Sequence, residues 1–352
     1  MTKLIADRIG ITLRKNDYAN FQELVVRRIE ATQLDAPEQY YLLLSTNTPK
    51  SHQEWEILIS EITNTESFFF RDKGQFKLLK KYIFPNIINQ KSHQKKINIC
   101  SAGCSTGEEP YSLAILIKDM IPNLKDWDIK IWGVDVNASA IQAAKEGRYR
   151  AWSFRGVDKK LQQQFFREGE SCYHIHDEIK DMVDFQVGNL LDDSSSDPFS
   201  TIQDIDLMLC RNVFIYFNSS AIEKVLTKMH GALAPLGYLL VGHTELYSQN
   251  LNRFNIKMFE ESIAYQRPEN DSTQPASEFL SIKMSPDSLK SVETKFDQED
   301  LSEVFKGHNI KMHKVALELL RQLPGDSKIA KLGNRTASEL ITQLENNLEE
   351  TD

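Results

Sequence analysis

The sequence has few cysteines and no long apolar run, which argues against a disulfide-stabilised protein and against a membrane-spanning protein. Four cysteines in 352 residues make no disulfide framework, so a cytoplasmic location is the simplest expectation. No stretch approaches the roughly 18 apolar residues of a membrane span. The start, MTKLIADRIG, lacks the apolar region of a secretory signal, so no membrane insertion is expected. The net charge of −8 argues against a nucleic-acid partner, which normally requires a basic protein.

The hydrophobic pattern changes along the chain and predicts a folded region of two parts. Residues 1–75 read as a small helical domain, since their apolar residues recur at helical spacing. Residues 76–267 alternate short apolar strands with amphipathic helices, which is typical of a mostly parallel α/β sheet. We expect a small β-subdomain near 165–187 in this part, and a closing antiparallel hairpin around Arg253–Gln266.

The remainder of the chain has a different composition. Residues 268–304 are rich in Ser, Asp, Glu, Gln and Pro and predict a flexible linker, because they bury too little apolar surface to offset chain entropy. Residues 305–352 predict a helical C-terminal tail with two amphipathic segments around a Pro-Gly turn. From Glu269 to Asp352 there are 16 acidic and 10 basic residues, so much of the negative charge lies here.

The most informative segment is Ile97–Ser112, where a predicted strand enters a glycine-containing loop ahead of a helix. Gly103 and Gly107 permit a tight turn and close approach of a ligand. The loop has neither the lysine of a phosphate-binding P-loop nor the spacing of a dinucleotide motif. Two acids, Glu108 and Glu109, open the helix. They suit an ammonium or sulfonium ligand, or they complement the helix dipole.

Two further segments follow predicted strands and are expected at the same edge of the sheet. Asp135 ends IWGVDV, where an acid can accept both hydroxyls of an adenosine ribose. Since the phosphate-binding machinery is missing, S-adenosylmethionine fits best. The segment CRNVFIYF carries Arg211, Asn212 and Tyr216 beside that cofactor. Tyr216 either directs its hydroxyl at the transferring methyl group or is a core aromatic residue.

A fourth segment, TNTESFFFRD, joins three consecutive phenylalanines to polar neighbours. In one interpretation it is an interdomain hydrophobic plug followed by a solvated Arg71. In the other it is an aromatic wall that fixes a substrate, while Arg71 supplies a cation to the site.

Taken in order and spacing, TESFFFRD, SAGCSTGEEPYS, GVDVNASAIQAAKEGRYR, GNLLDD, LCRNVFIYF and VGHTE resemble the motifs of the CheR family of chemotaxis receptor glutamate methyltransferases, over about residues 8–267. The resemblance implies a Rossmann-like sheet of the S-adenosylmethionine-dependent methyltransferase type, preceded by a small all-α N-terminal domain. It also implies a protein-glutamate O-methyltransferase that forms methyl esters on the cytoplasmic helices of methyl-accepting chemotaxis receptors and so adapts chemosensory signalling.

The family's site residues carry over position by position. Thr65 stands where the family often has Asn, and Ser67 where it usually has Thr. Arg71 and Tyr216 are the implied catalytic residues. The implied cofactor-binding residues are Thr65, Ser67, Arg71, Glu109, Asp135, Asn189, Leu190, Arg211 and Asn212.

The stretch FFREGESCYHIHDEIKDMVDF contains one glycine, Gly169, where many family members have a glycine-rich turn that grips a receptor tether. It therefore resembles the tether (pentapeptide)-independent branch. Cys172, His174 and His176 within it are too few for a structural zinc site, so no metal is predicted. We expect a monomer, with the partner of the tail left open. The alternative function is an S-adenosylmethionine-binding regulatory or scaffold protein of a chemosensory-like pathway without efficient catalysis.

Basic residues are concentrated between Arg71 and Lys96, where Asp72 is the one acid. Together with nearby bases they form either a docking patch for an acidic receptor helix or a solvated basic face. The residues in question are Arg14, Lys15, Arg27, Arg28, Arg71, Lys73, Lys77, Lys80, Lys81, Lys91, Lys95 and Lys96.

Overall fold

The structure is a computed structural model, and it describes residues 1–270 apart from 195–196, 247–248 and 261, together with 328–329, 335–336, 338–339 and 341–342. One compact unit comprises Met1–His243 and Asn250–Pro275. A second comprises Thr244–Gln249 and Ala276–Asp352, in which β11 (Lys328–Ile329) pairs antiparallel with β12 (Arg335–Thr336). The predicted linker and tail helices lie almost entirely outside the described residues.

The chain begins with four helices, as predicted. Pro37 and Pro49 open the third and fourth, in the first turn, where the missing N–H of proline costs no hydrogen bond. The backbone N–H of Ser51 donates to the Thr48 hydroxyl at 3.2 Å and caps the fourth. These helices are α1 (Thr2–Ile9), α2 (Tyr18–Ala31), α3 (Pro37–Ser45) and α4 (Pro49–Ile62), and they share one apolar core.

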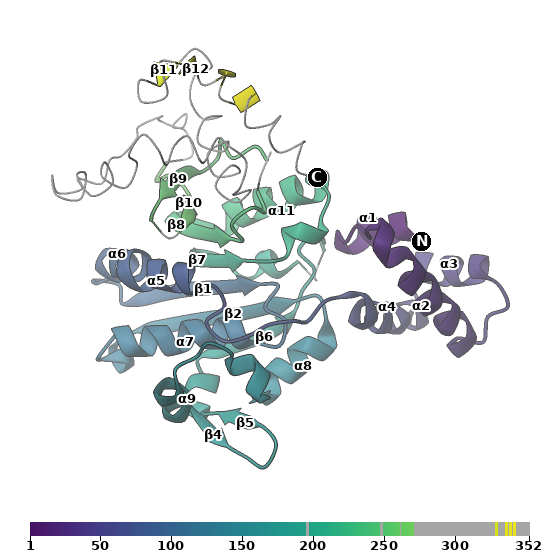
Figure 1. Ribbon diagram of the computed structural model, residues 1–352, viewed down its shortest axis with the longest axis horizontal. Coiled ribbons are helices and arrows are strands. Elements are labelled where there is room, and N and C mark those ends of the chain that lie inside the picture. The colour runs from purple at the N-terminus through teal and green to yellow at the C-terminus, as the bar shows by residue number, and fades with distance from the viewer. Residues whose placement is uncertain are drawn as a thin grey trace. The chain divides into compact units, whose positions relative to one another are not determined.

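A seven-stranded sheet follows, in the order β6-β2-β1-β7-β8-β10-β9 (Figure 1). The first five strands in this order are parallel to one another, and β10 is antiparallel to both of its neighbours. The expected alternation and the closing hairpin are therefore confirmed. The strands are β1 (Lys96–Ala102), β2 (Asp128–Asp135), β6 (Val183–Val187), β7 (Ile205–Cys210), β8 (Leu233–Val241), β9 (Asn255–Met258) and β10 (Ile263–Gln266).

Helices lie on both sides of this sheet (Figure 1). They are α5 (Lys73–Leu78), a π-helical turn (Leu79–Ile83), α6 (Phe84–Gln90), α7 (Glu108–Met120), α8 (Ala138–Glu146) and α11 (Ser219–Ala232). Ser219 or Ser220 is a plausible N-cap of α11 from sequence, but the Asn218 side chain takes that role by accepting from the Ala221 N–H at 2.9 Å. None of the helices in the described part of the chain is long and apolar enough to cross a membrane.

A three-stranded antiparallel sheet lies beside the large one. It consists of β3 (Arg148–Tyr149), β5 (Tyr173–Ile175) and β4 (Phe166–Glu168), with η4 (Ala151–Phe154) and α9 (Lys159–Phe165) between β3 and β4. This sheet includes strand β3, which precedes the predicted stretch 165–187. A short helix, α10 (Asp177–Lys180), then leads into β6, which pairs with β2 in the large sheet.

Candidate functional site

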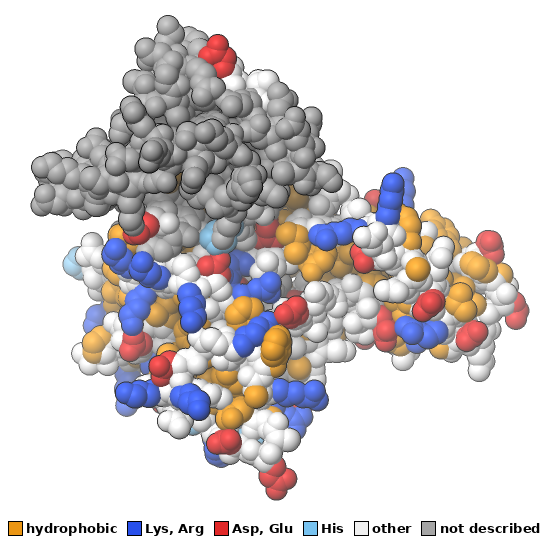
Figure 2. Space-filling model, viewed as in Figure 1, with side chains coloured by type: hydrophobic (Ala, Val, Ile, Leu, Met, Phe, Trp, Pro, Cys, Tyr) orange, Lys and Arg blue, Asp and Glu red, His pale blue; other side chains and the backbone are white. Residues whose placement is uncertain are grey.

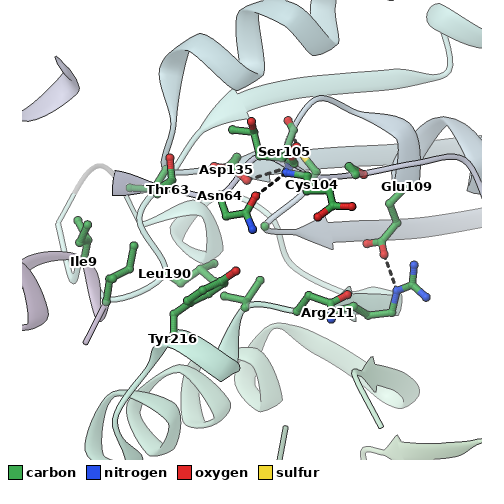
Figure 3. Close-up of a pocket in the computed structure, with 18 of the residues that line it drawn as sticks. Ile9, Thr63, Asn64, Cys104, Ser105, Glu109, Asp135, Leu190, Arg211 and Tyr216 are labelled. Carbon is green, nitrogen blue, oxygen red and sulfur yellow. Dashed lines mark hydrogen bonds and ion pairs between the residues drawn. The ribbon is translucent and has the colours of Figure 1, made fainter. Parts of the chain in front are cut away.

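A cavity opens at the carboxyl ends of β1, β2, β6 and β7 (Figure 3). The strand order reverses between β1 and β7, so the loops after these strands diverge and leave a crevice there. The cavity spans about 1050 Å³, including the open solvent at its mouth. All ten of the residues predicted from the sequence line it, namely Thr65, Ser67, Arg71, Glu109, Asp135, Asn189, Leu190, Arg211, Asn212 and Tyr216.

The loop after β1 makes the tight turn that its glycines predict. Gly103 has φ +76° and Gly107 has φ +93°. A Cβ added at Gly103 would lie 2.3 Å from Val213 Cγ2, and one added at Gly107 would lie 2.8 Å from Ala144 Cβ. Gly103 therefore lets two cavity loops approach each other, and Gly107 lets α7 pack against α8.

Asp135 ends β2 with both carboxylate oxygens held by backbone N–H groups. Oδ2 accepts from Ser105 at 2.8 Å, and Oδ1 accepts from Asn137 at 2.9 Å. Burial raises the pKa of Asp135, and these backbone hydrogen bonds oppose the rise. Each carboxylate oxygen keeps a second lone pair, so the group can still accept hydroxyl donors from the cavity.

The two acids at the start of α7 face different surroundings. Glu108 is buried outside the cavity lining, accepts from the hydroxyls of Thr106 at 2.7 Å and Ser153 at 3.1 Å, and has its pKa raised by burial. Glu109 lines the cavity. The interpretation of the pair as ligand-facing acids therefore fails for Glu108, because neighbouring helical residues point about 100° apart.

Glu109 forms a buried ion pair with Arg211. Arg211 Nε donates to Glu109 Oε2 at 2.6 Å, and the other carboxylate oxygen accepts from the Ser101 hydroxyl at 2.7 Å. Arg211 Nη1 also donates to the Arg71 carbonyl at 2.8 Å and to Gln75 Oε1 at 3.0 Å. One guanidinium thus connects the loop after β7, the start of α7 and the phenylalanine segment.

The three phenylalanines have three different roles, and neither of the two predicted interpretations describes them all. Phe68 lines the cavity. Phe69 is 1% exposed and packs among Tyr149, Phe154 and Phe166, with ring centroids 4.8–5.1 Å away. Phe70 packs against Phe76 with its centroid 5.1 Å away. Arg71 lines the cavity beside Phe68 and donates to the Glu66 carbonyl at 3.2 Å.

Asp72 fastens the end of this segment to the end of β8. Its carboxylate lies 2.5 Å from His243 Nε2 and accepts from the Gln75 N–H at 3.2 Å. Burial would raise the pKa of Asp72, but these partners lower it to about 2. The sequence motif VGHTE contains His243, yet no local pattern links it to a residue 171 positions earlier.

The N-terminal segment closes another side of the cavity, which the sequence analysis did not predict. Ile9 and Ile11 are in the lining, and Figure 3 shows Ile9 on the same side as Leu190 and away from Asp135. The Thr12 N–H donates to the Tyr216 carbonyl at 2.7 Å, which positions the tyrosine ring. The one available hint is Gly10, whose φ of +81° ends α1 where a Cβ would meet Phe217 at 2.8 Å.

Three of the predicted cofactor-binding residues also make contacts within the protein. The Asn189 amide donates to the Arg8 carbonyl at 2.7 Å. The Thr65 carbonyl accepts from the Ser105 hydroxyl at 2.8 Å, and the Ser67 hydroxyl bonds to Glu108. These contacts hold the cavity wall together from inside the protein.

Much of the predicted basic patch is engaged elsewhere. Arg28 binds Glu54, whose side chain is 5% exposed. Lys91 binds the buried Asp206 at 2.7 Å, Lys80 pairs with Asp119, and Lys95 pairs with Asp126. These four bases therefore have partners within the protein, and docking of an acidic helix on the predicted patch stays a prediction.

The cysteines are buried or half-buried, and none of them pairs with another. Among the residues that the structure describes, no group of three or more His, Cys, Asp or Glu could hold a metal ion. Cys100, Cys104 and Cys210 are buried, as expected for small apolar side chains. Burial raises the pKa of Cys100 to about 12, so it is a neutral thiol.

The sheet topology, the acid that ends β2 and the glycine loop after β1 define an S-adenosylmethionine-dependent methyltransferase. A family model described as "CheR methyltransferase, SAM binding domain" matches residues 65–263, more than half of the chain. The chain belongs to the CheR methyltransferase family. The predicted cofactor and enzyme class are thereby confirmed.

Its relatives include three chemotaxis methyltransferases. Chemotaxis protein methyltransferase 2 of Vibrio cholerae is 28% identical over 262 residues, which cover 74% of this chain and 89% of that protein. Chemotaxis protein methyltransferase 1 of Pseudomonas aeruginosa is 31% identical over 217 residues, 60% of this chain and 77% of that protein. The Borreliella burgdorferi chemotaxis protein methyltransferase is 33% identical over 199 residues, 55% and 69% respectively.

Proposed function

We propose that this chain methylates glutamate side chains on the cytoplasmic helices of methyl-accepting chemotaxis receptors, and that it acts as a monomer in the cytoplasm. The observation that carries the proposal is one cavity in which Asp135 and Glu109 lie near Arg71 and Tyr216. The names of the relatives support chemotaxis receptors as the substrate class. They do not favour the alternative of a non-catalytic scaffold.

The residues present fit S-adenosylmethionine. Asp135 offers two lone-pair acceptors for a ribose diol, and Val136 and Leu190 offer apolar contacts for an adenine ring. Glu109 offers a carboxylate to an ammonium group while Arg211 and Ser101 fix its orientation. The bound cofactor supplies a methyl group on a positively charged sulfur.

Methyl transfer to a carboxylate requires the protein to position the reactants and does not require a general base. A glutamate with a pKa near 4.3 is already ionised at pH 7, so the nucleophile needs no deprotonation. Alignment of two reactants can contribute ~7–11 kcal/mol in model reactions. We assign Arg71 to orient the acceptor carboxylate. We assign Tyr216 to limit the direction from which that carboxylate approaches the methyl group. Arg71 Nη1 donates to the Glu66 carbonyl, and the remaining guanidinium N–H groups can donate to the acceptor.

The test uses radiolabelled cofactor with receptor-containing membranes and the variants Arg71→Ala and Tyr216→Phe. We expect the wild type to form base-labile methyl esters on receptor glutamates, mapped by mass spectrometry. Tyr216→Phe should lower the single-turnover rate at least tenfold and retain cofactor affinity within about threefold, and Arg71→Ala should lower the single-turnover rate at saturating cofactor at least tenfold. A base-stable product would contradict glutamate methylation, and unchanged rates in both variants would contradict the assigned roles.

Receptor engagement is proposed to be independent of a C-terminal tether. Between β4 and β5 the loop contains Gly169, where an added Cβ would meet the Cys172 carbonyl at 3.1 Å and His174 at 3.2 Å. The loop turns tightly on itself, since the Gly169 N–H donates to the Cys172 carbonyl at 2.8 Å. Deleting the last residues of a receptor should therefore leave its methylation rate by this enzyme unchanged.

A further inference from the structure

Beside the cavity, one arginine is held between two aromatic rings. The Arg155 guanidinium carbon lies 3.7 Å from the centroid of Phe68 and 4.4 Å from that of Trp152. Arg155 Nη2 also binds Glu66 Oε1 at 2.8 Å, and Nη1 donates to the Trp152 carbonyl at 3.1 Å. We call Trp152, Arg155 and Phe68 the aromatic stack.

The aromatic stack joins the cavity to solvent. Phe68 and Glu66 line the cavity, and the Arg155 side chain is 24% exposed. Trp152 is 67% exposed, more than any other large hydrophobic residue in the described part of the chain. Trp152 stays largely exposed to solvent, although Phe154, two residues further along the chain, belongs to a buried aromatic cluster. Exposed Trp beside Arg is the composition of binding hot spots.

Glu66 pairs with Arg155, and several basic side chains lie near the aromatic stack. Arg150 and Lys73 are exposed, and a Cβ on Gly156, next to Arg155, would lie 3.6 Å from the Lys73 ammonium. Arg71 lies on the inner side, 5.6 Å from the Phe68 centroid. On the face of the sheet domain that carries α7 and α9, Figure 2 shows Lys and Arg side chains interspersed with hydrophobic ones. An acidic, partly apolar partner complements such a surface.

We propose that the aromatic stack docks the substrate helix, as an acidic amphipathic helix that carries the target glutamate. An apolar side chain of that helix packs on Trp152, and a carboxylate three or four residues from the target faces Arg155 and Arg150. Residues at this spacing share one helix face, so one carboxylate can enter the cavity while the next stays outside. The proposal rests on the proposed function, because the target glutamate is its substrate.

Contact with Arg155 would also set the position of the Phe68 ring. Arg155 contacts the ring on one face, and the ring forms part of the cavity wall. Substrate contact with Trp152 and Arg155 therefore reaches the cavity wall through Phe68, and also through Glu66, which pairs with Arg155. Loss of the aromatic stack should raise KM for the protein substrate far more than it changes affinity for the cofactor.

The experiment uses the full chain and two synthetic amphipathic helical peptides that share their apolar residues. One has glutamates on its polar face, and the other has lysines in their place. Fluorescence anisotropy of the labelled peptides measures binding to the wild type and to Trp152→Ala, Arg155→Ala and Arg155→Lys. Arg148→Ala is the matched control, because Arg148, on β3, is an exposed arginine that pairs with Glu146 at the end of α8.

We expect the wild type to bind the glutamate peptide at least tenfold more tightly than the lysine peptide. Trp152→Ala and Arg155→Ala should each weaken that binding about tenfold, and the control should change it less than twofold. Arg155→Lys keeps the charge but loses the planar stacking, so it should restore part of the loss. Equal binding of both peptides, or no effect of Trp152→Ala, overturns the proposal.

The methylation assay on receptor membranes separates the two hypotheses. If the wild type methylates receptors and Trp152→Ala leaves KM unchanged, docking at the aromatic stack is wrong and the proposed function stands. If the wild type binds the glutamate peptide at the aromatic stack but methylates no receptor, the substrate assignment is wrong for both. A raised KM with unchanged calorimetric affinity for S-adenosylhomocysteine is the supporting result.

Discussion

The ion pair between Arg211 and Glu109 gives a quantitative test of how the cavity is held. Its side chains are 4% and 12% exposed, and Arg211 Nε lies 2.6 Å from Glu109 Oε2. Arg211→Met keeps an unbranched apolar stem but not the guanidinium, and it removes three hydrogen bonds, to Glu109, the Arg71 carbonyl and Gln75. Removing one partner of a buried pair typically costs about 3–5 kcal/mol of unfolding free energy. Because Ser101 still donates to Glu109, we expect about 3 kcal/mol.

The matched comparison is Arg211→Met combined with Glu109→Gln. A neutral glutamine can still accept from the Ser101 hydroxyl, so the double variant should recover about 2 kcal/mol of the loss. Urea unfolding followed by circular dichroism measures these values, and calorimetry measures affinity for S-adenosylhomocysteine. We expect both variants to bind it at least tenfold more weakly. Additive losses in the double variant, or a single-variant loss below about 1 kcal/mol, would refute the energetic coupling.

Three further results are expected. Asp135→Ala should abolish calorimetric binding of the cofactor, and near-normal affinity would remove the ribose assignment. Asp72→Asn should lower unfolding free energy by about 2 kcal/mol at neutral pH, because the pKa of Asp72 is held at about 2, below its ordinary value. That difference is fully present above about pH 4 and should disappear towards pH 2 in urea titrations. Gly103→Ala should cost about 3 kcal/mol through backbone strain and the contact with Val213, and Val213→Ala in the same chain should recover more than half.

The sequence predicts the sheet and the cavity because both follow from local patterns. Apolar strands alternating with helices indicate parallel pairing, and the carboxyl ends of parallel strands share an edge. Asp135, Glu109 and Arg211 each lie at or just beyond such an end, so their convergence needs no long-range information. The N-cap of α11 is different, since Asn218, Ser219 and Ser220 are all competent caps and the local pattern does not decide among them.

Contacts between distant segments could not be predicted. Ile9 reaches the cavity because the segment that follows α1 pairs with the loop after β7, and apart from Gly10 nothing in its own neighbourhood indicates this. The ion-pair partners of the basic residues could not be predicted for the same reason. Lys91 and Arg28 read as exposed cations, but the acids that bind them, Asp206 and Glu54, are 115 and 26 positions away. Charge counting records how many bases a segment has and not which partners the fold gives them.

Several residues beside the cavity have a strained backbone conformation. Four residues other than glycine next to the cavity have positive φ, namely Phe70 at 53°, Asp72 at 66°, Ser105 at 51° and Asn212 at 61°. Each costs about 1–2 kcal/mol, so these conformations persist because partners hold them. The Phe70 N–H donates to the Ser112 hydroxyl at 3.0 Å, Asp72 binds His243, and the Ser105 N–H donates to Asp135. The shape of the cavity therefore depends on residues such as Ser112 and His243 that do not line it. Substitutions there should alter catalysis through the position of Arg71 and of the loop after β1.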